Sequence, residues 1–447
     1  MKILKTLALA AVAAASANLA PAATNIYIVG SNGDRSATQQ ALTNIFGSGT
    51  GAFGNWTFQG DKGSASKVGA TVTGLSNATN SNYGAFNGFY SGTNVIVRVS
   101  FIGAAGAVGA LATPQQARFV VSTGTGSGVI KSPYDATAVL NTDYTLNFAD
   151  FGFSTNFQET TPFTGGSYDQ LTAETVGVSP MVFVASPGFP ATNITSALAQ
   201  FLYTAGALPV SLFSGTATDQ NKIVFAIGRN TDAGQRYETY GEIGLGTAST
   251  VKVWQPTITG QLTDANNIKY GGTATSQRLW PIETISGINS GARGNGGYDT
   301  GGNLAPILTI ANVGSNVYTG KDTGAANPNF APYPSATAGY YIGYLTVGDY
   351  NTRINQAGFA TSVQLQFNGV SYSDEAVRQG KYTFWVYNRI LKPSAGLTGI
   401  VDAFHDTLRD QILNVDATAN GGLRVNDPAH PFAVERYTDG GLVSPLF

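Results

Sequence analysis

The sequence has no cysteine among its 447 residues and only two histidines. The first absence excludes disulfide bonds and a lipid anchor on cysteine, and it leaves His405 and His430 without the partners of a usual zinc site. Charged residues make up only 11% of the chain, against about 25% in an average globular protein. With a formal net charge of −2 there is no general positive field for nucleic acid, so an anion site must depend on local geometry.

The motifs of common catalytic sites are missing as well. Neither a Gly-x-Ser-x-Gly nucleophile elbow nor a Gly-x4-Gly-Lys-Ser/Thr phosphate loop occurs, and no carboxylates fall at a recognisable calcium spacing. We therefore expect a protein that is not an enzyme, with no catalytic residue, no bound metal and no cofactor.

The first 22 residues have the features of a secretory signal peptide. Lys2 and Lys5 precede the apolar run Leu7–Ala15, and Ala20-Pro-Ala22 offers a small-residue cleavage pattern. The run is too short for a membrane span, and no later stretch is long and apolar enough to be one. We expect cleavage near residue 22 or 23 and a mature protein in the periplasm or outside the cell.

Strands alternate with helices along the mature chain. Apolar runs predict strands at 25–29, 94–100, 176–185, 223–227, 340–346 and 382–387. Amphipathic patterns predict helices at 37–46, 194–204 and 397–413. This alternation favours an α/β fold with mainly parallel sheets flanked by helices. The abundant glycine, 56 residues, and the Gly-, Ser- and Asn-rich stretches in between predict loop-rich insertions.

One stretch combines a buried strand, a glycine-containing loop and the start of a helix. Ile223–Ile227 runs into the loop Gly228–Gly234, and a polar, helix-compatible run begins at Gln235. Such a turn aims unpaired backbone N–H groups at one point, which attracts anions. Arg229 and Arg236 bracket the loop, and a guanidinium can bind two oxygens of an oxyanion. The alternative is an ordinary surface turn whose arginines are only solvated.

Small polar residues stand at other strand ends. Ser31 lies in a loop between a predicted strand and a helix, and Ser154 with Thr155 ends an apolar segment, so their hydroxyl groups could donate hydrogen bonds to an anion. The spacing of glycines from Gly103 onward permits close backbone approach at a helix start, although it is not a dinucleotide fingerprint. Asp34 could cap the helix that follows it.

Several separate passages carry a resemblance to one family, and they occur in the family's order. They are Gly30-Ser31, Ser100–Leu111, Asp150–Thr161, Val176–Ala185, Asn193–Thr195, Gly228–Arg236, Gly297–Gly302, Phe367–Val370 and Gly380–Trp385. Together they resemble the periplasmic phosphate-binding proteins of ABC uptake systems, and in particular their larger, insertion-bearing relatives. The resemblance implies a two-lobed, type II periplasmic-binding fold, with lobe I formed by residues 23–163 and 338–447 and lobe II by residues 164–337.

The resemblance also implies a ligand and a partner. The ligand would be an inorganic oxyanion, with phosphate first, bound in the cleft between the lobes, and an ABC-type permease would receive it. The implied ligand-binding residues are Gly30, Ser31, Ser100, Gly103, Ser154, Thr155, Arg229, Gly234, Gln235 and Arg236. We expect no nucleic-acid partner and a monomeric protein. Arg293, Asp299 and Thr300 lie in a glycine-rich stretch and could also reach the cleft, but the sequence alone does not locate them relative to it.

The chain departs from the family pattern at the site itself. Where the family's central loop resembles Arg-x-Asp-x-Ser-Gly-Thr, the corresponding residues are Arg229, Thr231, Ala233, Gly234 and Gln235. Each lost neutral hydrogen-bond donor costs about 0.5 to 1.5 kcal/mol. These losses leave a second reading open, in which the chain is a surface or matrix structural protein that keeps the fold without tight ligand binding.

A carboxylate is also missing, because the family's Ser-Asp pair is matched by Ser154-Thr155. A carboxylate accepts a hydrogen bond from protonated phosphate and repels sulfate, which has no proton to give. Its loss should weaken selection between these two anions. Asp34 could take its place as the acceptor.

Overall fold

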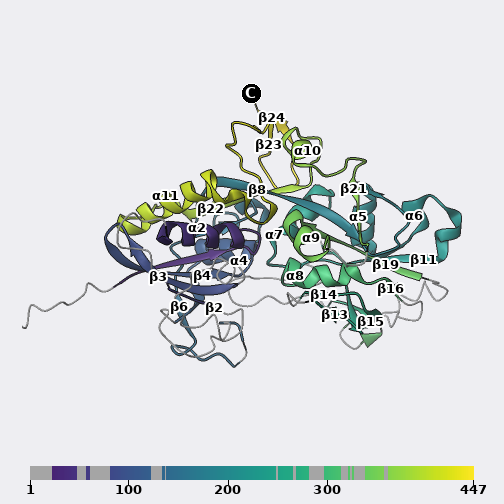
Figure 1. The fold of residues 1–447 in the computed structure, drawn as a ribbon, viewed down its shortest axis with the longest axis horizontal. Coiled ribbons are helices and arrows are strands. Elements are labelled where there is room, and N and C mark those ends of the chain that lie inside the picture. The colour runs from purple at the N-terminus through teal and green to yellow at the C-terminus, as the bar shows by residue number, and fades with distance from the viewer. Residues whose placement is uncertain are drawn as a thin grey trace, which may run out of the picture.

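The computed structural model describes residues 23–47, 57–60, 81–121, 133–135, 137–247, 250–264, 268–280, 296–313, 321–322, 325–326, 338–356 and 361–446. Within them the chain forms two lobes, each built of strands with helices packed against them (Figure 1). The α/β class expected from the sequence is confirmed. The predicted signal peptide and Arg293 lie outside the described residues.

The first lobe is built around the parallel strands β1 (Thr24–Gly30) and β4 (Thr93–Phe101). On one side β7 (Phe151–Ser154) lies parallel to β1, and on the other β3 (Tyr83–Tyr90) and β2 (Thr57–Gly60) continue the sheet in antiparallel order. The alternation of side chains along β1 gives each face of the sheet its own apolar surface.

Helices cover both faces of this sheet. Ile26 and Ile28 of β1 pack with α2 (Arg35–Gly47) and α11 (Gly399–Asn414), whose Phe404, Leu408 and Ile412 recur at four-residue steps. Val29 faces the opposite side and packs with the small residues of α4 (Ala104–Ala112). This arrangement places the carboxyl ends of β1, β4 and β7 at the edge that faces the second lobe.

The second lobe has its own central pair of parallel strands, β11 (Lys222–Ala226) and β19 (Ala338–Thr346). β10 (Ala207–Pro209) pairs with β11, and the sheet continues beyond β19 through β16 (Asn312–Val313), β15 (Thr273–Leu279) and β12 (Trp254–Thr259). The helices of this lobe are α5 (Ser196–Ala205), α6 (Ser211–Ser214), α7 (Gly234–Glu242), α8 (Gly301–Leu304) and α9 (Val347–Arg353).

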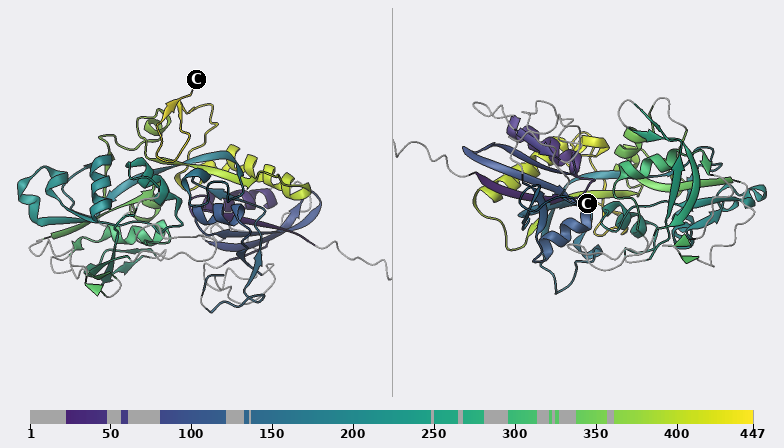
Figure 2. Two further views of the ribbon diagram at one scale, coloured as in Figure 1. Left: turned by 180° about the vertical axis from the view of Figure 1, so that it is seen from behind. Right: turned by 90° about the horizontal axis from the view of Figure 1, so that it is seen from below.

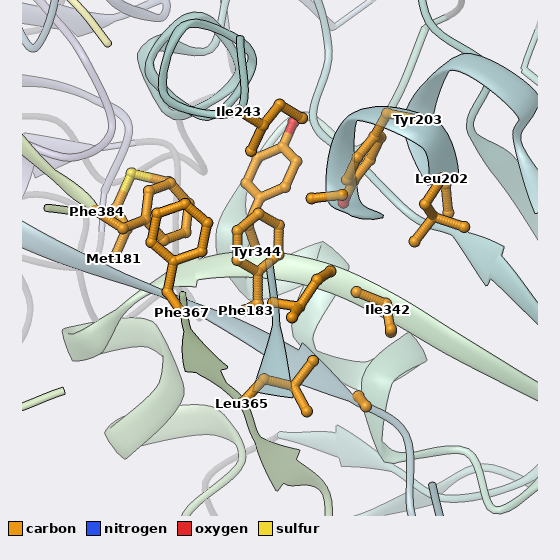
Figure 3. Packing of buried hydrophobic residues seen from close by; sticks show 14 of the residues in the cluster. Met181, Phe183, Leu202, Tyr203, Ile243, Ile342, Tyr344, Leu365, Phe367 and Phe384 are labelled. Atoms are coloured by element: carbon orange, nitrogen blue, oxygen red, sulfur yellow. The ribbon is translucent and has the colours of Figure 1, made fainter. Parts of the chain in front are cut away.

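Aromatic side chains fill the core of the second lobe. The rings of Phe183 and Phe384 stack with centroids 4.7 Å apart, and Tyr344 and Phe367 surround them (Figure 3). The hydroxyl of the buried Tyr344 accepts a hydrogen bond from the backbone N–H of Arg229 at 3.1 Å. A side chain of the aromatic core therefore holds the start of the loop that follows β11.

Two long antiparallel strands join the lobes. β8 (Leu171–Ala185) and β22 (Trp385–Pro393) pair along most of their length; the end of β22 pairs with β7, while the end of β8 pairs with β19. The hydrogen-bonded path therefore runs unbroken from β12 to β2. The expected mixed sheets are therefore joined into one path by β8 and β22; parallel pairing occurs chiefly at β1, β4, β7, β11 and β19, and most of the other described ladders are antiparallel.

Local element boundaries also differ from the prediction at two places. Ile194 belongs to β9 (Asn193–Ile194), and α5 begins at Ser196 because the side chain of Thr195 accepts a hydrogen bond from the N–H of Leu198. The strand predicted from 382 begins only at Trp385. Residues 338–353, which form β19 and α9, were assigned to the first lobe but pair and pack with β11 in the second; the rest of the assignment of residues 23–163, 164–337 and 338–447 stays a prediction.

The remaining elements are short. They are β5 (Ala117–Val120), β6 (Tyr144–Asn147), β13 (Leu262–Thr263), β14 (Lys269–Tyr270), β17 (Lys321–Asp322), β18 (Ala325–Ala326), β20 (Val363–Gln364), β21 (Gln366–Phe367), α10 (Asp374–Arg378) and the 3-10 turns η2 (Gln158–Thr160), η3 (Ala217–Asn221), η4 (Ala305–Thr309) and η6 (Asp416–Gly421). The hairpin of β23 (Val434–Glu435) and β24 (Ser444–Pro445) projects where the lobes meet (Figure 2). None of the helices in the described residues has the length and apolar character needed to cross a bilayer.

Candidate functional site

A cavity of about 230 Å³ lies between the two lobes. The first lobe contributes Asn32, from the loop after β1, and Arg35, the first residue of α2. The second lobe supplies the other lining residues, which are Arg229, Gln235, Ile268, Lys269, Thr300, Gly301, Gly302, Asn303, Pro306, Asp349 and Arg353. Both lobes therefore contribute to one site.

The loop after β11 is held in place by the segment around Tyr298. Tyr298 donates its backbone N–H to the carbonyl of Gly228 at 3.0 Å and accepts from the N–H of Asn230 at 3.1 Å. Gly297 lies so close that a Cβ there would be 2.4 Å from the carbonyl carbon of Arg229. Only glycine fits this approach, which fixes the backbone of Arg229 at the cavity.

The side chain of Arg229 is oriented by three acceptors. Its Nε donates to the carbonyl of Tyr298 at 2.9 Å and its Nη2 to that of Asp299 at 2.8 Å, while Nη1 donates to Oε1 of Gln235. Three of its five N–H groups are thereby used, which leaves two for a ligand. Arg229 is only 2% exposed, and burial lowers the pKa of its guanidinium because the charged form is desolvated.

The lining carries an excess of positive charge. Arg35, Arg229, Lys269 and Arg353 face the cavity with one carboxylate, Asp349, among the lining residues that the structure describes. Neither Lys269 nor Arg353 has a hydrogen-bond or ion-pair partner elsewhere in the described residues. Because opposite charge is scarce, the cavity attracts an anion.

Acceptor groups are also present in the cavity. Oδ2 of Asp349 accepts from the hydroxyl of Thr346 at 3.2 Å. Asn32 donates its Nδ2 to the carbonyl of Asp299 at 3.3 Å, but its Oδ1 is buried without a hydrogen-bond partner. A ligand that supplies a donor would satisfy this oxygen.

Of the residues predicted to bind, Arg229 and Gln235 line the cavity. Thr300, which the sequence named without placing, lines it as well, where its side chain caps α8 by accepting from the N–H of Asn303. Asp299 contributes its backbone carbonyl to the support of Arg229. The structure thus brings together the residues that surround the central arginine.

The other predicted binding residues lie where the lobes touch directly. A Cβ on Gly234 would be 1.8 Å from Oγ1 of Thr155, and one on Gly103 would be 2.4 Å from the carbonyl oxygen of Asp232. Gly103 also donates its N–H to the carbonyl of Gly30 at 3.2 Å. The crevice expected at the strand ends is therefore closed at these contacts, and the cavity lies beside them at the loops after β1 and β11.

Hydrogen bonds within the protein engage the predicted hydroxyl groups and Arg236. Ser100 donates to the carbonyl of Arg118 at 2.9 Å, and Oγ of Ser154 accepts from the N–H of Asn156 at 3.0 Å. Arg236 donates to the carbonyl of Arg229 at 3.0 Å. None of these side chains lines the cavity, nor do Gly30, Ser31, Gly103, Thr155 and Gly234, and their part in binding stays a prediction.

Asp34 lies between Asn32 and Arg35 in the sequence but does not line the cavity. Its carboxyl group accepts from the hydroxyl of Ser31 at 2.5 Å, while Oδ1 is buried without a partner. Burial raises the pKa of Asp34 to about 7, against the smaller opposing effects of Ser31 and the charge of Arg389. Near neutral pH the proton on this buried carboxyl group is therefore partly retained.

Sequence reasoning missed Asn32, Arg35, Lys269, Asp349 and Arg353. They come from three separate segments, and each looks like an ordinary solvated surface residue in its own neighbourhood. The passage Gly297–Gly302, which was noted for its resemblance, contains none of them.

Several solved structures align with this fold over most of the chain. An ABC-type phosphate transport receptor from Vibrio cholerae aligns at 10% identity over 89% of this chain and 99% of that chain, with a TM-score of 0.42. A putative phosphate ABC transporter substrate-binding protein from Clostridium perfringens, with bound phosphate, aligns at 10% identity over 90% and 100%, with a TM-score of 0.39. A phosphate-binding protein from Stenotrophomonas maltophilia aligns at 11% identity over 89% and 86%, with a TM-score of 0.34.

The likeness noted in the sequence is found again among these structures. No protein-family model and no curated protein matches the chain.

Proposed function

We propose that this chain is a secreted solute-binding protein that holds phosphate or a similar oxyanion between its lobes and delivers it to an ABC-type permease. The observation that carries the proposal is the cavity shared by both lobes, in which four cationic side chains face one carboxylate among the described lining residues. The role proposed is reversible binding, without a catalytic step.

The central arginine is suited to this task. Arg229 is buried and held by Tyr298, Asp299 and Gln235, so little side-chain entropy remains to be lost when a ligand binds. Its charge is not neutralised by an ion pair within 4 Å in the described residues. Hydrogen bonds from charged donors to an oxyanion are short and strong, and they gain strength where water is excluded.

Arg353 adds a second cation, whose side chain is not used in holding the described part of the fold together. Its guanidinium lies 3.7 Å from the position that a Cβ on Gly302 would take, at the end of α9, and it has no hydrogen-bond partner in the described residues. An arginine in such a position loses nothing within the protein when it binds an anion. Its removal should therefore affect binding more than folding.

The test is a calorimetric titration of the mature protein, unfolded and refolded to remove carried-over ligand, with phosphate and with sulfate. We expect one-to-one saturation in the micromolar range or tighter. Arg353→Gln should weaken binding by about 10- to 100-fold, because a hydrogen bond to a charged group contributes about 1.5 to 3 kcal/mol. Lys381→Gln removes an equal charge from an exposed site outside the cavity and should have no effect.

Arg229→Ala should abolish saturation, and its folding is to be checked by circular dichroism, since this residue is buried. Equal binding by the wild type, Arg353→Gln and Arg229→Ala would refute the proposed site. Heat changes that stay flat at millimolar anion would refute the function.

A second candidate is a surface or matrix protein that keeps the fold without binding a ligand tightly. The direct packing of Gly234 on Thr155 and of Gly103 on Asp232 favours it, since these contacts close part of the crevice at the strand ends. Flat titrations together with a stable, monodisperse protein would support this candidate.

A further inference from the structure

We propose that the ligand of the cavity is a phosphate monoester of a small polyol or sugar and not free orthophosphate. This inference rests on the proposed function, namely that the cavity holds an oxyanion. Three features of the cavity carry it: its size, the chemistry of its uncharged lining and two acceptors that an oxyanion alone does not satisfy.

The cavity is larger than a single tetrahedral anion requires. Its volume is about 230 Å³. A water molecule takes up about 30 Å³ in the liquid, so there is room for about eight water-sized groups. Orthophosphate has only a phosphorus atom and its four oxygens, and it would leave part of the space to water. A ligand about twice as large fits better.

The uncharged lining is suited to hydroxyl groups. Amide and hydroxyl side chains come from Asn32, Gln235, Thr300 and Asn303, and such groups both donate and accept hydrogen bonds. The apolar lining consists of Ile268 and Pro306, and no aromatic ring lines the cavity within the described residues. A nucleobase or another flat apolar group would find no stacking surface here. The lining therefore favours a polyhydroxylated ligand.

Two acceptors need donors from the ligand. Oδ1 of Asn32 is buried on the first-lobe side without a partner, and the carboxylate of Asp349 on the second-lobe side accepts only from Thr346 in the described residues. Near neutral pH orthophosphate is a mixture of the monoanion and the dianion, and the dianion, which a cationic cavity favours, has one proton to donate and cannot serve both acceptors. An ester with free hydroxyl groups can place its phosphate against Arg229 and Arg353 and donate to both acceptors.

The experiment compares four probes on the mature protein by calorimetric titration at pH 7.5: orthophosphate, glycerol 3-phosphate, glucose 6-phosphate and glycerol. We expect at least one of the two esters to bind ten-fold or more tightly than orthophosphate, and glycerol not to bind. Asn32→Ala and Asp349→Asn should each reduce the preference for the ester over orthophosphate, measured as the ratio of their affinities, about five-fold or more.

The outcomes separate this inference from the function on which it rests. If orthophosphate binds as tightly as both esters or more tightly, the inference is overturned while the oxyanion site stands. If neither orthophosphate nor an ester binds, the proposed function itself fails. If an ester is preferred but both variants keep the full preference, the assignment of Asn32 and Asp349 as hydroxyl acceptors is wrong.

Discussion

The buried carboxyl group of Asp34 gives the protein a pH dependence that can be worked out from the structure. Asp34 is 2% exposed, and burial raises its pKa from 3.8 to about 7. The folded state therefore binds this proton more tightly than the unfolded state. The stabilising contribution of Asp34 is fully present below pH 4 and is lost as the pH rises through about 7.

The size of the effect follows from the same values. One pH unit of difference between the folded and unfolded pKa corresponds to about 1.4 kcal/mol, so the change from 3.8 to about 7 gives at most about 4 kcal/mol. Asp34→Asn keeps the shape and leaves an oxygen that can accept from the hydroxyl of Ser31. It cannot ionise, so the variant should lack this part of the pH dependence.

The assay is urea unfolding of the wild type and Asp34→Asn at intervals from pH 4 to pH 8. The two proteins should have similar free energies of unfolding at pH 4, and Asp34→Asn should become more stable than the wild type by several kcal/mol at pH 8. Asp169→Asn changes an exposed carboxylate and serves as the control. The reasoning would be refuted if the difference in the free energy of unfolding did not change with pH, or if the wild type became more stable relative to the variant as the pH rises.

Two further predictions concern the contacts that hold the lobes together. Gly234→Ala should destabilise the protein by about 1 to 3 kcal/mol in urea, because the new methyl group would lie 1.8 Å from Oγ1 of Thr155; Gly166→Ala, with nothing within 4 Å, should be neutral. Arg436→Met should cost about 3 to 5 kcal/mol in the same assay, because it leaves the fully buried Glu238 without its cation, and a loss under 1 kcal/mol would contradict this.

The sequence alone determined the elements that depend on local patterns. The apolar runs predicted β1, β4, β11 and β19, and the four-residue repeat predicted α11 to within two residues. These features are local because side-chain periodicity records which face of a strand or helix is buried.

The sequence alone also identified two residues that line the cavity. Arg229 follows a buried strand, Gln235 lies in the first turn of the next helix, and both line the cavity. A strand, a glycine-containing loop and a helix start lie within one short stretch, so the geometry is set mainly by neighbouring residues.

Only the tertiary structure decided which other residues reach the cavity. Asp349 and Arg353 lie on α9, Lys269 on β14 and Arg35 on α2, and each is unremarkable in its own segment. The antiparallel crossing of β8 and β22 likewise depends on partners more than 200 residues apart in the chain. An excess of charge arises from side chains that folding brings together, and no local pattern in the sequence records it.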